Sequence, residues 1–299
     1  MVNIAIVGDI HLHFSEVDAF YFNQSDYDLI LFVGDLSNYT PRVGLMIARQ
    51  IARIQKPAVF IPGNHDCTTI LQLAGEIWQK PRLAQISGWG QKWRVQALEA
   101  ALDQTVFAGY STHHFQIAGL DFDVVAARPF SMGGPTFSFQ PYLQNRYGIA
   151  NLDESAERLR QCVDQTQSNR LIFLAHNGPT GLGHAPTDIW GRDFNPAGGD
   201  FGDPDLEQAI AYAKEQGKQV LAVIAGHLHH HTKSGQQRLW LVEKDSTKYV
   251  NAARVPRVFV SNGDEVRHHV RMTLEDTAVS IKERLVNMLQ FAVFSEYDL

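Results

Sequence analysis

The sequence predicts an α/β fold in which helices cover both faces of a sheet. Five short aliphatic runs have the length of strands and are nearly continuous, as strands buried on both faces are: 2–7, 29–33, 58–61, 171–175 and 220–225. Three segments between or after them carry apolar residues at helical spacing: 43–54, 152–163 and 206–217. Strands that alternate with helices form βαβ crossovers, and these place helices against the sheet.

The last third of the chain has a different pattern. Residues 238–242, 257–260 and 266–274 are typical of successive strands joined by turns, and they predict an antiparallel or mixed second sheet. Gly217 is placed to end the helix 206–217. Residues 178–204 are rich in Gly, Pro and Asp and predict a long loop, which in a compact domain is more often functional than idle.

The 299 residues suffice for one large α/β domain or two smaller ones. We find no linker or internal repeat, and we therefore predict a single domain over residues 1–275. The interval 68–168 is long enough to hold a cap-like insertion. Three tryptophans lie there, and we expect them to close a small core rather than to stack on a nucleobase: Trp78, Trp89 and Trp93. Residues 276–299 pack on the core or form a dimer contact, which leaves room for a homo-oligomer.

Composition argues against several classes of protein. Hydrophobic residues make up 44% and charged residues 19%, which is typical of a globular chain and not of a disordered one. A net charge of −6 gives no basic field, so long nucleic acid is not expected as a partner. No apolar run reaches the ~20 residues that a membrane helix requires, so no membrane partner is expected either. The N-terminus lacks the pattern of a signal peptide, and Cys67 and Cys162 are far apart; we expect a cytoplasmic protein.

Residues able to bind metal follow each of the five buried strands directly. These segments are Asp9-Ile10-His11, Gly34-Asp35, Gly63-Asn64-His65-Asp66, His176-Asn177 and Gly226-His227-Leu228-His229. Ligands bind at the carboxyl ends of strands in open α/β sheets, so the five segments should converge on one crevice. The glycines before three of these groups allow the backbone to turn sharply.

The types of ligand in these segments also fit together chemically. Carboxylate, imidazole and amide oxygen suit Mn, Fe or Zn, and there is no thiolate to select a softer metal. Two divalent metal ions can share one bridging carboxylate and clamp the attacking and leaving oxygens of an in-line displacement. Asp35 is in a suitable position for that bridge. The sequence therefore predicts a dinuclear hydrolytic centre.

This series of motifs resembles the calcineurin-like metallophosphoesterase family, and it spans residues 9–229. The whole chain is also similar to a subgroup found in cyanobacteria and plants. The resemblance implies a four-layer αββα sandwich of two mixed sheets flanked by helices. It also implies two ligand sets: Asp9, His11, Asp35 and His229 at one ion, and Asp35, Asn64, His176 and His227 at the other. His65 is then not a ligand but faces the substrate phosphoryl group.

The expected reaction is hydrolysis of a phosphomonoester, phosphodiester or pyrophosphate bond of a small molecule. Coordination lowers the pKa of water from 15.7 to about 7, and a hydroxide that bridges the metals attacks phosphorus. His65 stabilises the developing charge or protonates the leaving oxygen. Asp66 either accepts a hydrogen bond from the other ring nitrogen of His65 or caps a helix. His65 and Asp66 are the predicted catalytic residues.

Three further residues are candidates for contacts with the substrate. Arg128 and Arg192 can pair bidentately with a phosphate, and Arg192 is the better candidate because it lies in the loop after His176. His13 lies two residues beyond His11 and either flanks the site or touches the substrate. A structural role is the alternative for each of the three.

Three other functions compete with the small-molecule phosphoesterase. A Ser/Thr protein phosphatase resembles this chain at the metal ligands, but such enzymes usually carry paired arginines beside their third and fourth motifs, and no Arg adjoins Asn64-His65-Asp66. A non-catalytic scaffold that keeps the fold and binds a protein partner should lack ligands or the catalytic His, and here every one is present. A DNA-processing nuclease is disfavoured by the acidic net charge.

Overall fold

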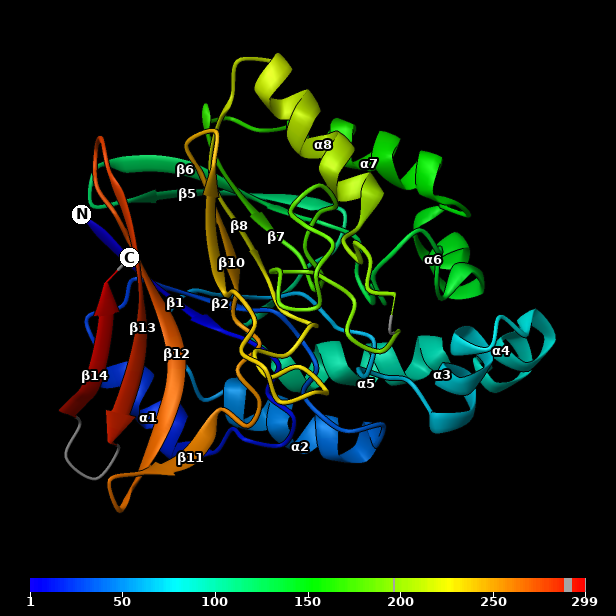
Figure 1. The fold of residues 1–299 in the computed structure, drawn as a ribbon, viewed down its shortest axis with the longest axis horizontal. Helices are drawn as coiled ribbons and strands as arrows, with labels where there is room; N and C mark the ends of the chain where they lie inside the picture. Colours follow the sequence, from blue (N-terminus) through cyan, green and yellow to red (C-terminus); the bar gives the residue numbers. More distant parts are fainter. Residues whose placement is uncertain (196, 288–291, 299) are drawn as a thin grey trace.

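Two stacked sheets form the centre of the molecule, and helices cover both outer faces (Figure 1). The computed structural model describes residues 1–195, 197–287 and 292–298. The helices α1, α2 and α5 lie along one outer face, and α7 and α8 lie along the other. This arrangement of two mixed sheets between helices confirms the expected four-layer αββα sandwich.

The first sheet has eight strands within the described residues. Four parallel strands form one half, in the order β1 (Val2–Val7), β2 (Leu29–Phe32), β3 (Ala58–Phe60) and β4 (Val106–Phe107). The other half is antiparallel and consists of β11 (Val258–Ser261), β12 (Asp264–Leu274), β13 (Val279–Asn287) and β14 (Ala292–Asp298). The two halves join where β12 pairs with β1.

The second sheet has six strands within the same part of the chain. Its order is β5 (Ser111–Ile117), β6 (Leu120–Ala126), β7 (Arg170–Leu174), β8 (Gln219–Ala225), β10 (Thr247–Asn251) and β9 (Leu241–Lys244). The four inner strands are parallel, and β5 and β9 add an antiparallel strand at each edge.

Helices form where the sequence predicts them, with ends shifted by at most three residues. The three expected helices are α2 (Pro41–Ile51), α7 (Leu152–Asp164) and α8 (Pro204–Glu215). Proline starts α2 and α8, and Gly217 follows the end of α8 with φ +75°, as a left-handed residue after a helix does. The remaining helices are α1 (Glu16–Gln24), α3 (Ile70–Ile77), α4 (Pro81–Ser87), α5 (Gln91–Leu102) and α6 (Gln140–Tyr147).

Both faces of the central strands are buried, which explains the continuous aliphatic runs. In β1, Ile4 and Ile6 belong to the core between the sheets, whereas Ala5 and Val7 belong to the core under the helices. Alternate residues of a strand point to opposite faces, so a strand covered on both sides needs apolar residues throughout.

The expectation that residues 238–242, 257–260 and 266–274 form an antiparallel or mixed second sheet is wrong for the last two of these segments. The strands β11 and β12 join the first sheet, and β9 joins the second. The reason is that β2 to β4 all lie on one side of β1, so its other edge is free. The strand β12 pairs there and adds Val270 and Met272 to the core between the sheets.

The strand expected at 238–242 begins only at Leu241. Arg238 is buried instead, and its guanidinium donates hydrogen bonds to the carbonyl oxygens of Asp188, Gly191 and His229. This side chain therefore ties the long loop after β7 to the loop after β8.

The interval 68–168 contributes mainly to the sandwich itself. It supplies β4 to β6 and the helices α5 to α7, whereas α3 and α4 project from the end of the molecule (Figure 1). The C-terminal segment 276–299 contains β13 and β14, and its residues 288–291 and 299 lie outside the described part. No helix in the described part has the length and apolarity needed to cross a membrane.

The expectation that the three tryptophans close a core is wrong. Trp78, Trp89 and Trp93 are 65%, 79% and 60% exposed. They lie at the end of α3, before α5 and within α5.

Candidate metal centre

The five predicted segments meet at one end of the sandwich, between the two sheets. Three strands of the first sheet (β1, β2 and β3) and two of the second (β7 and β8) all end there, because each group is parallel and the sheets face each other. The residues that follow them are Asp9, His11, Asp35, Asn64, His65, His176, His227 and His229. Every sequence-predicted metal ligand lies in this group.

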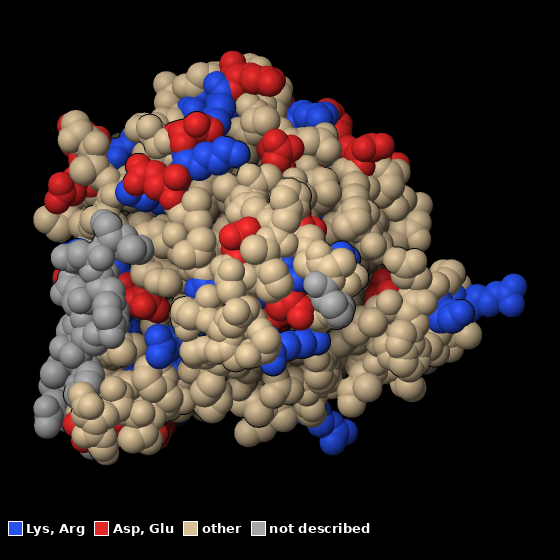
Figure 2. Space-filling model, viewed as in Figure 1, with Lys and Arg blue, Asp and Glu red and all other residues tan. Residues whose placement is uncertain are grey.

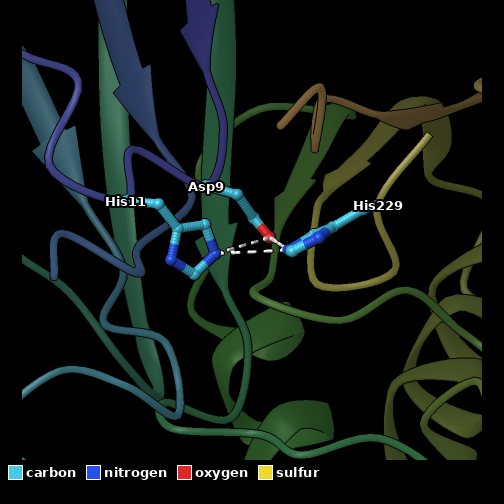
Figure 3. A group of neighbouring side chains, drawn as sticks. All are labelled: Asp9, His11 and His229. Atoms are coloured by element: carbon cyan, nitrogen blue, oxygen red, sulfur yellow. Dashed lines mark hydrogen bonds and ion pairs between the residues drawn. The ribbon is translucent and has the colours of Figure 1, made fainter. Parts of the chain in front are cut away.

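One cluster consists of Asp9, His11 and His229 (Figure 3). Nε2 of His229 lies 3.5 Å from Oδ2 of Asp9 and 3.2 Å from Nε2 of His11. One ligand atom from each residue lies within 4.8 Å of the others. Two imidazole nitrogens and a carboxylate oxygen thus face the same small space, as ligands of one ion do.

A second cluster of the same kind consists of Asp35, His176 and His227. Nε2 of His176 lies 3.5 Å from Oδ2 of Asp35 and 3.3 Å from Nδ1 of His227. Oδ1 of Asn64 lies 3.0 Å from Nε2 of His176.

Asp35 connects the two clusters. Its Oδ2 lies 3.8 Å from Nε2 of His11 in the first cluster and 3.5 Å from Nε2 of His176 in the second. Oδ2 of Asp35 also lies 3.9 Å from Nε2 of His65, and His11, Asp35 and His65 form a third group that satisfies the same distance limits. The carboxylate of Asp35 therefore stands in the middle of the site.

Hydrogen bonds on the far side of two imidazoles fix which nitrogen faces the clusters. Nδ1 of His11 lies 2.6 Å from Oδ1 of Asn38, and Nδ1 of His176 lies 2.6 Å from the carbonyl oxygen of Val33. A carbonyl oxygen only accepts, so Nδ1 of His176 carries the proton and Nε2 presents its lone pair. Partners of this kind orient metal-binding histidines.

The carboxylates of the site are buried, and their basic neighbours are histidines. Asp9 and Asp35 are 0% and 2% exposed, and among the described residues neither forms an ion pair with Lys or Arg. Burial acts to raise the pKa of Asp9, but the nearby imidazoles of His229 and His176 bring it below its usual range. The imidazole of His65 is the main group that likewise lowers the pKa of Asp35 against burial.

The pKa values of two of the histidines are shifted in opposite directions. Burial lowers the pKa of His227 to about 3, so this imidazole is neutral and able to donate a lone pair. Burial also opposes protonation of His176, but the carboxylates of Asp35 and Asp9 outweigh it and raise its pKa.

The backbone at the site is strained. Four of the candidate ligands have positive φ: Asp9 (35°), His11 (38°), Asp35 (52°) and His227 (70°). A non-glycine residue in this region is uncommon and costs on the order of 1–3 kcal/mol, and such residues cluster at functional sites.

Glycines make the close packing of the ligands feasible. Gly34 has φ +89°, as the prediction of a sharp turn requires. Gly63 and Gly226 are needed for a different reason, which is the space beside them. A Cβ on Gly63 would lie 2.2 Å from Oδ1 of Asp35, and a Cβ on Gly226 would lie 2.2 Å from Oδ1 of Asp9. These two glycines leave room for the carboxylates.

A family model described as calcineurin-like phosphoesterase matches residues 2–231. The chain belongs to this family. No curated protein sequence matches it significantly.

Among solved structures, one is similar with a TM-score of 0.53 at 10% identity, over 93% of this chain and 97% of that chain. Vps29 from Entamoeba histolytica complexed with Zn²⁺ is 11% identical over 99% of both chains, with a TM-score of 0.39. A metallophosphoesterase from Sphaerobacter thermophilus is 13% identical over 95% of this chain and 88% of that chain, with a TM-score of 0.33. At sequence identities this low, the similarity concerns the fold alone.

Asp66 does not orient His65 in this member of the family, and both roles expected for it are wrong. Its carboxylate accepts hydrogen bonds from the backbone N–H groups of Asp35, Leu36 and Gly63, at 2.9 Å each. The helix that follows is capped by Thr69. Asp66 thus joins the loop after β2 to the loop after β3, and burial together with Asp35 raises its pKa to about 7.

His65 stands at the wall of the site, and its side chain is 15% exposed. Its Nδ1 is buried and has no hydrogen-bond partner among the described residues. Its ring stacks on Tyr39, with centroids 4.1 Å apart. Sequence reasoning missed Tyr39 and also Asn38, although both follow Asp35 closely, and Tyr39 has an unusual φ of +60° that only coordinates reveal.

A cavity of about 960 Å³ opens in front of the centre. Asp35, Asn64, His65, His227 and His229 lie at its wall beside residues from the loops around them. The long loop after β7 contributes four of these: Arg192, Asp193, Phe194 and Phe201.

The three residues predicted to contact the substrate differ in where they lie relative to the cavity. Arg192 lines the cavity, where its guanidinium donates to the carbonyl oxygen of Gly198. Arg128 is fully buried and forms ion pairs with Asp203 and Asp205, so the expectation that it binds substrate is wrong.

The third candidate, His13, is not among the described residues that line the cavity. Its carbonyl oxygen accepts a hydrogen bond from Arg257. Sequence reasoning missed Lys233, a second cation at the cavity wall, since no motif marks it.

Proposed function

We propose that this chain is a metal-dependent phosphoesterase that hydrolyses a phosphomonoester, phosphodiester or pyrophosphate bond of a small molecule. The observation that carries the proposal is the meeting of two carboxylates, four imidazoles and an amide oxygen at one end of the two sheets, where four of the seven residues line one cavity. Asp9 and Asp35 are buried and lack a Lys or Arg partner within the described residues, and buried charges of this kind require a cation.

The donor set fits two divalent metal ions of the Mn, Fe or Zn type. In our assignment one site comprises Asp9, His11, Asp35 and His229, and the other comprises Asp35, Asn64, His176 and His227. Metal ions in such sites polarise a phosphoryl oxygen and lower the pKa of bound water. The chain's own part is to hold these ligands in place through Asn38, the Val33 carbonyl and the strained loops.

His65 is proposed to act on the phosphoryl group rather than as a ligand. Burial lowers its pKa more strongly than Asp35 raises it, so the ring is neutral at neutral pH. A neutral imidazole stabilises a developing negative charge by donating an N–H, and this favours that role over protonation of the leaving oxygen. The stack on Tyr39 holds the ring at the cavity wall.

The cavity supports a substrate with an anionic end and an apolar part. Arg192 and Lys233 supply positive charge at its wall, while Leu73, Met132 and Phe194 supply apolar surface. Cavities of about 300–1,000 Å³ typically hold small molecules. We therefore favour a phosphate ester of a small organic molecule over a phosphoprotein.

The test is a screen of the protein reconstituted with Mn, Fe or Zn. Bis-p-nitrophenyl phosphate is compared with p-nitrophenyl phosphate and a panel of nucleotides. Asp35→Asn serves as the blank and should lower kcat by at least about a hundredfold, because it removes the charge shared by both ligand sets. Asp153→Asn, at an exposed position on α7, is the matched control and should keep full activity. Activity that survives in Asp35→Asn, or no activity in any metal form, would contradict the proposal.

A further inference from the structure

The helix α3 exposes an apolar face, and its buried side contains a glutamine beside Leu73. Ile70, Leu71, Ile77 and Trp78 follow one another at steps of one, six and one positions, which places them on one side of a helix. All four are 59–66% exposed. The opposite side includes Gln72, which is 2% exposed and hydrogen-bonded to the equally buried Gln91. A helix on a globular protein normally exposes its polar face instead.

The exposed apolar side chains continue into the next two helices. Ile86 lies in α4, and Trp89 and Trp93 lie before and within α5 with their rings edge to face at 5.5 Å. Seven of the sixteen large hydrophobic side chains that are exposed in the described chain fall within residues 70–93. An exposed apolar concentration of this kind marks an interaction site.

The same segment is basic, although the chain as a whole has a charge of −6. Lys80, Arg82 and Lys92 are exposed, and none forms an ion pair with another described residue. Glu76 is the one acidic residue between 69 and 94, and it is partly buried. Figure 2 shows Lys and Arg side chains on the projecting end of the molecule that α4 forms in Figure 1.

We propose that this hairpin surface docks onto a lipid bilayer that carries anionic headgroups. The hairpin surface comprises Ile70, Leu71, Ile77, Trp78, Ile86, Trp89 and Trp93 together with Lys80, Arg82 and Lys92. Helices that lie in the membrane interface combine Trp and aliphatic residues with Lys and Arg in this way. With eight and seven residues, α3 and α4 are too short to span a bilayer, so the contact is peripheral.

The positive charge of the hairpin surface favours an anionic bilayer over a second copy of the chain as the partner. In a symmetric dimer the same patch lies on both subunits, so three unpaired cations of one copy would approach three of the other. An anionic lipid surface instead offers each of them a counter-charge.

The hairpin is held rigidly enough to present this surface. A Cβ on Gly75 would lie 2.7 Å from the backbone nitrogen of Ala84, so α3 and α4 are in close contact. Arg94 donates to the carbonyl oxygen of Cys67 and to Oε1 of Gln72, which fixes α3 to the start of α5. Leu73, Ile77 and Gln79 also line the candidate site cavity. Docking would therefore bring that cavity beside the lipid headgroups. The meaning of this placement for catalysis rests on the proposed function, whereas the docking proposal does not.

The test is flotation of the whole protein with vesicles, which needs no activity. Phosphatidylcholine vesicles are compared with vesicles that contain about one third phosphatidylglycerol. We expect binding to the anionic vesicles only. The variant Trp78→Ala/Trp89→Ala/Trp93→Ala should lower binding at least about tenfold, because it removes apolar area that enters the interface. The control Met46→Ala/Val260→Ala removes equally exposed apolar side chains elsewhere and should bind normally.

A second variant pair tests the charges. Lys80→Ala/Arg82→Ala/Lys92→Ala should lower binding about a hundredfold, since each basic residue near an anionic surface strengthens binding about fivefold. Arg42→Ala/Arg49→Ala, at exposed positions on α2, should leave binding unchanged. No binding to anionic vesicles, or equal binding to both kinds, overturns the proposal. A third result would also overturn it: the wild type binds no vesicles and forms a dimer in light scattering, whereas the tryptophan variant is a monomer.

Discussion

The clearest consequence of the corrected role of Arg128 is that its removal should destabilise the fold. Arg128→Met keeps a side chain of similar length and removes the guanidinium. In the structure, Nε lies 2.8 Å from Oδ2 of Asp205 and Nη2 lies 3.0 Å from Oδ1 of Asp203. All three side chains are buried. The substitution therefore leaves two buried carboxylates without their cation.

The size of the effect follows from that geometry. Breaking a buried ion pair by removing one partner costs about 3–5 kcal/mol of unfolding free energy. A chain of this size should then lose about 6–15 °C in Tm. Burial already raises the pKa of Asp203 to about 6, and loss of Arg128 raises it further. An acid whose pKa is higher in the folded state loses stability as pH rises from its unfolded pKa to its folded pKa. The deficit should therefore be larger at pH 8 than at pH 5.5.

Urea unfolding followed by circular dichroism at both pH values measures this deficit. Arg192→Met is the matched control. Arg192 is half-buried and donates to one carbonyl oxygen, so the variant should lose less than about 1 kcal/mol. The reasoning is refuted if Arg128→Met also loses less than about 1 kcal/mol. A raised KM without loss of stability would return Arg128 to the role of a substrate contact.

Three further outcomes are expected at the centre itself. His65→Ala should keep the bound metal, measured by elemental analysis, and lower kcat by about 10²–10⁴-fold; loss of metal would make His65 a ligand instead. Gly63→Ala should weaken metal binding at least about tenfold in a calorimetric titration, because its Cβ would collide with Asp35 and His176, and unchanged affinity would contradict the packing described. The pKa values of His176 and His229 are raised because their neighbouring carboxylates outweigh burial, so protons compete with metal there. Metal affinity should fall as pH is lowered from about 8 to about 6, and calorimetry in two buffers should detect proton release; a pH-independent affinity would argue against these ligands.

The parts of the fold that were predictable from sequence have strong local patterns. Strands buried on both faces are continuous aliphatic runs, and β1, β2, β3, β7 and β8 were recognised for that reason. Their shared direction then brings together residues as distant as Asp9 and His229. Only the five strand ends and the parallel order were needed to group the candidate ligands.

The parts that were missed depend on contacts between distant segments. The pairing of β12 with β1 joins residues about 270 apart, and nothing in either strand specifies the other. The identity of Arg128 indicates its charge but not its burial, and the two carboxylates that neutralise it lie more than 70 residues away. Asn38 and Tyr39 acquire roles only because the loop after β2 folds back over His11 and His65.

Strain and buried charge at the centre point to the same conclusion by separate routes. Asp9 and Asp35 have positive φ, and their carboxylates are buried with no Lys or Arg partner among the described residues. Each feature lowers the stability of the folded chain on its own. Neither is needed for packing, because an alanine at these positions would remove the buried charge and a glycine would remove the backbone strain. A bound cation would offset both, since it neutralises the carboxylates and holds the loops that carry them. The ligand geometry is thus the feature that the rest of the fold stabilises, as expected for a site that binds metal in order to function.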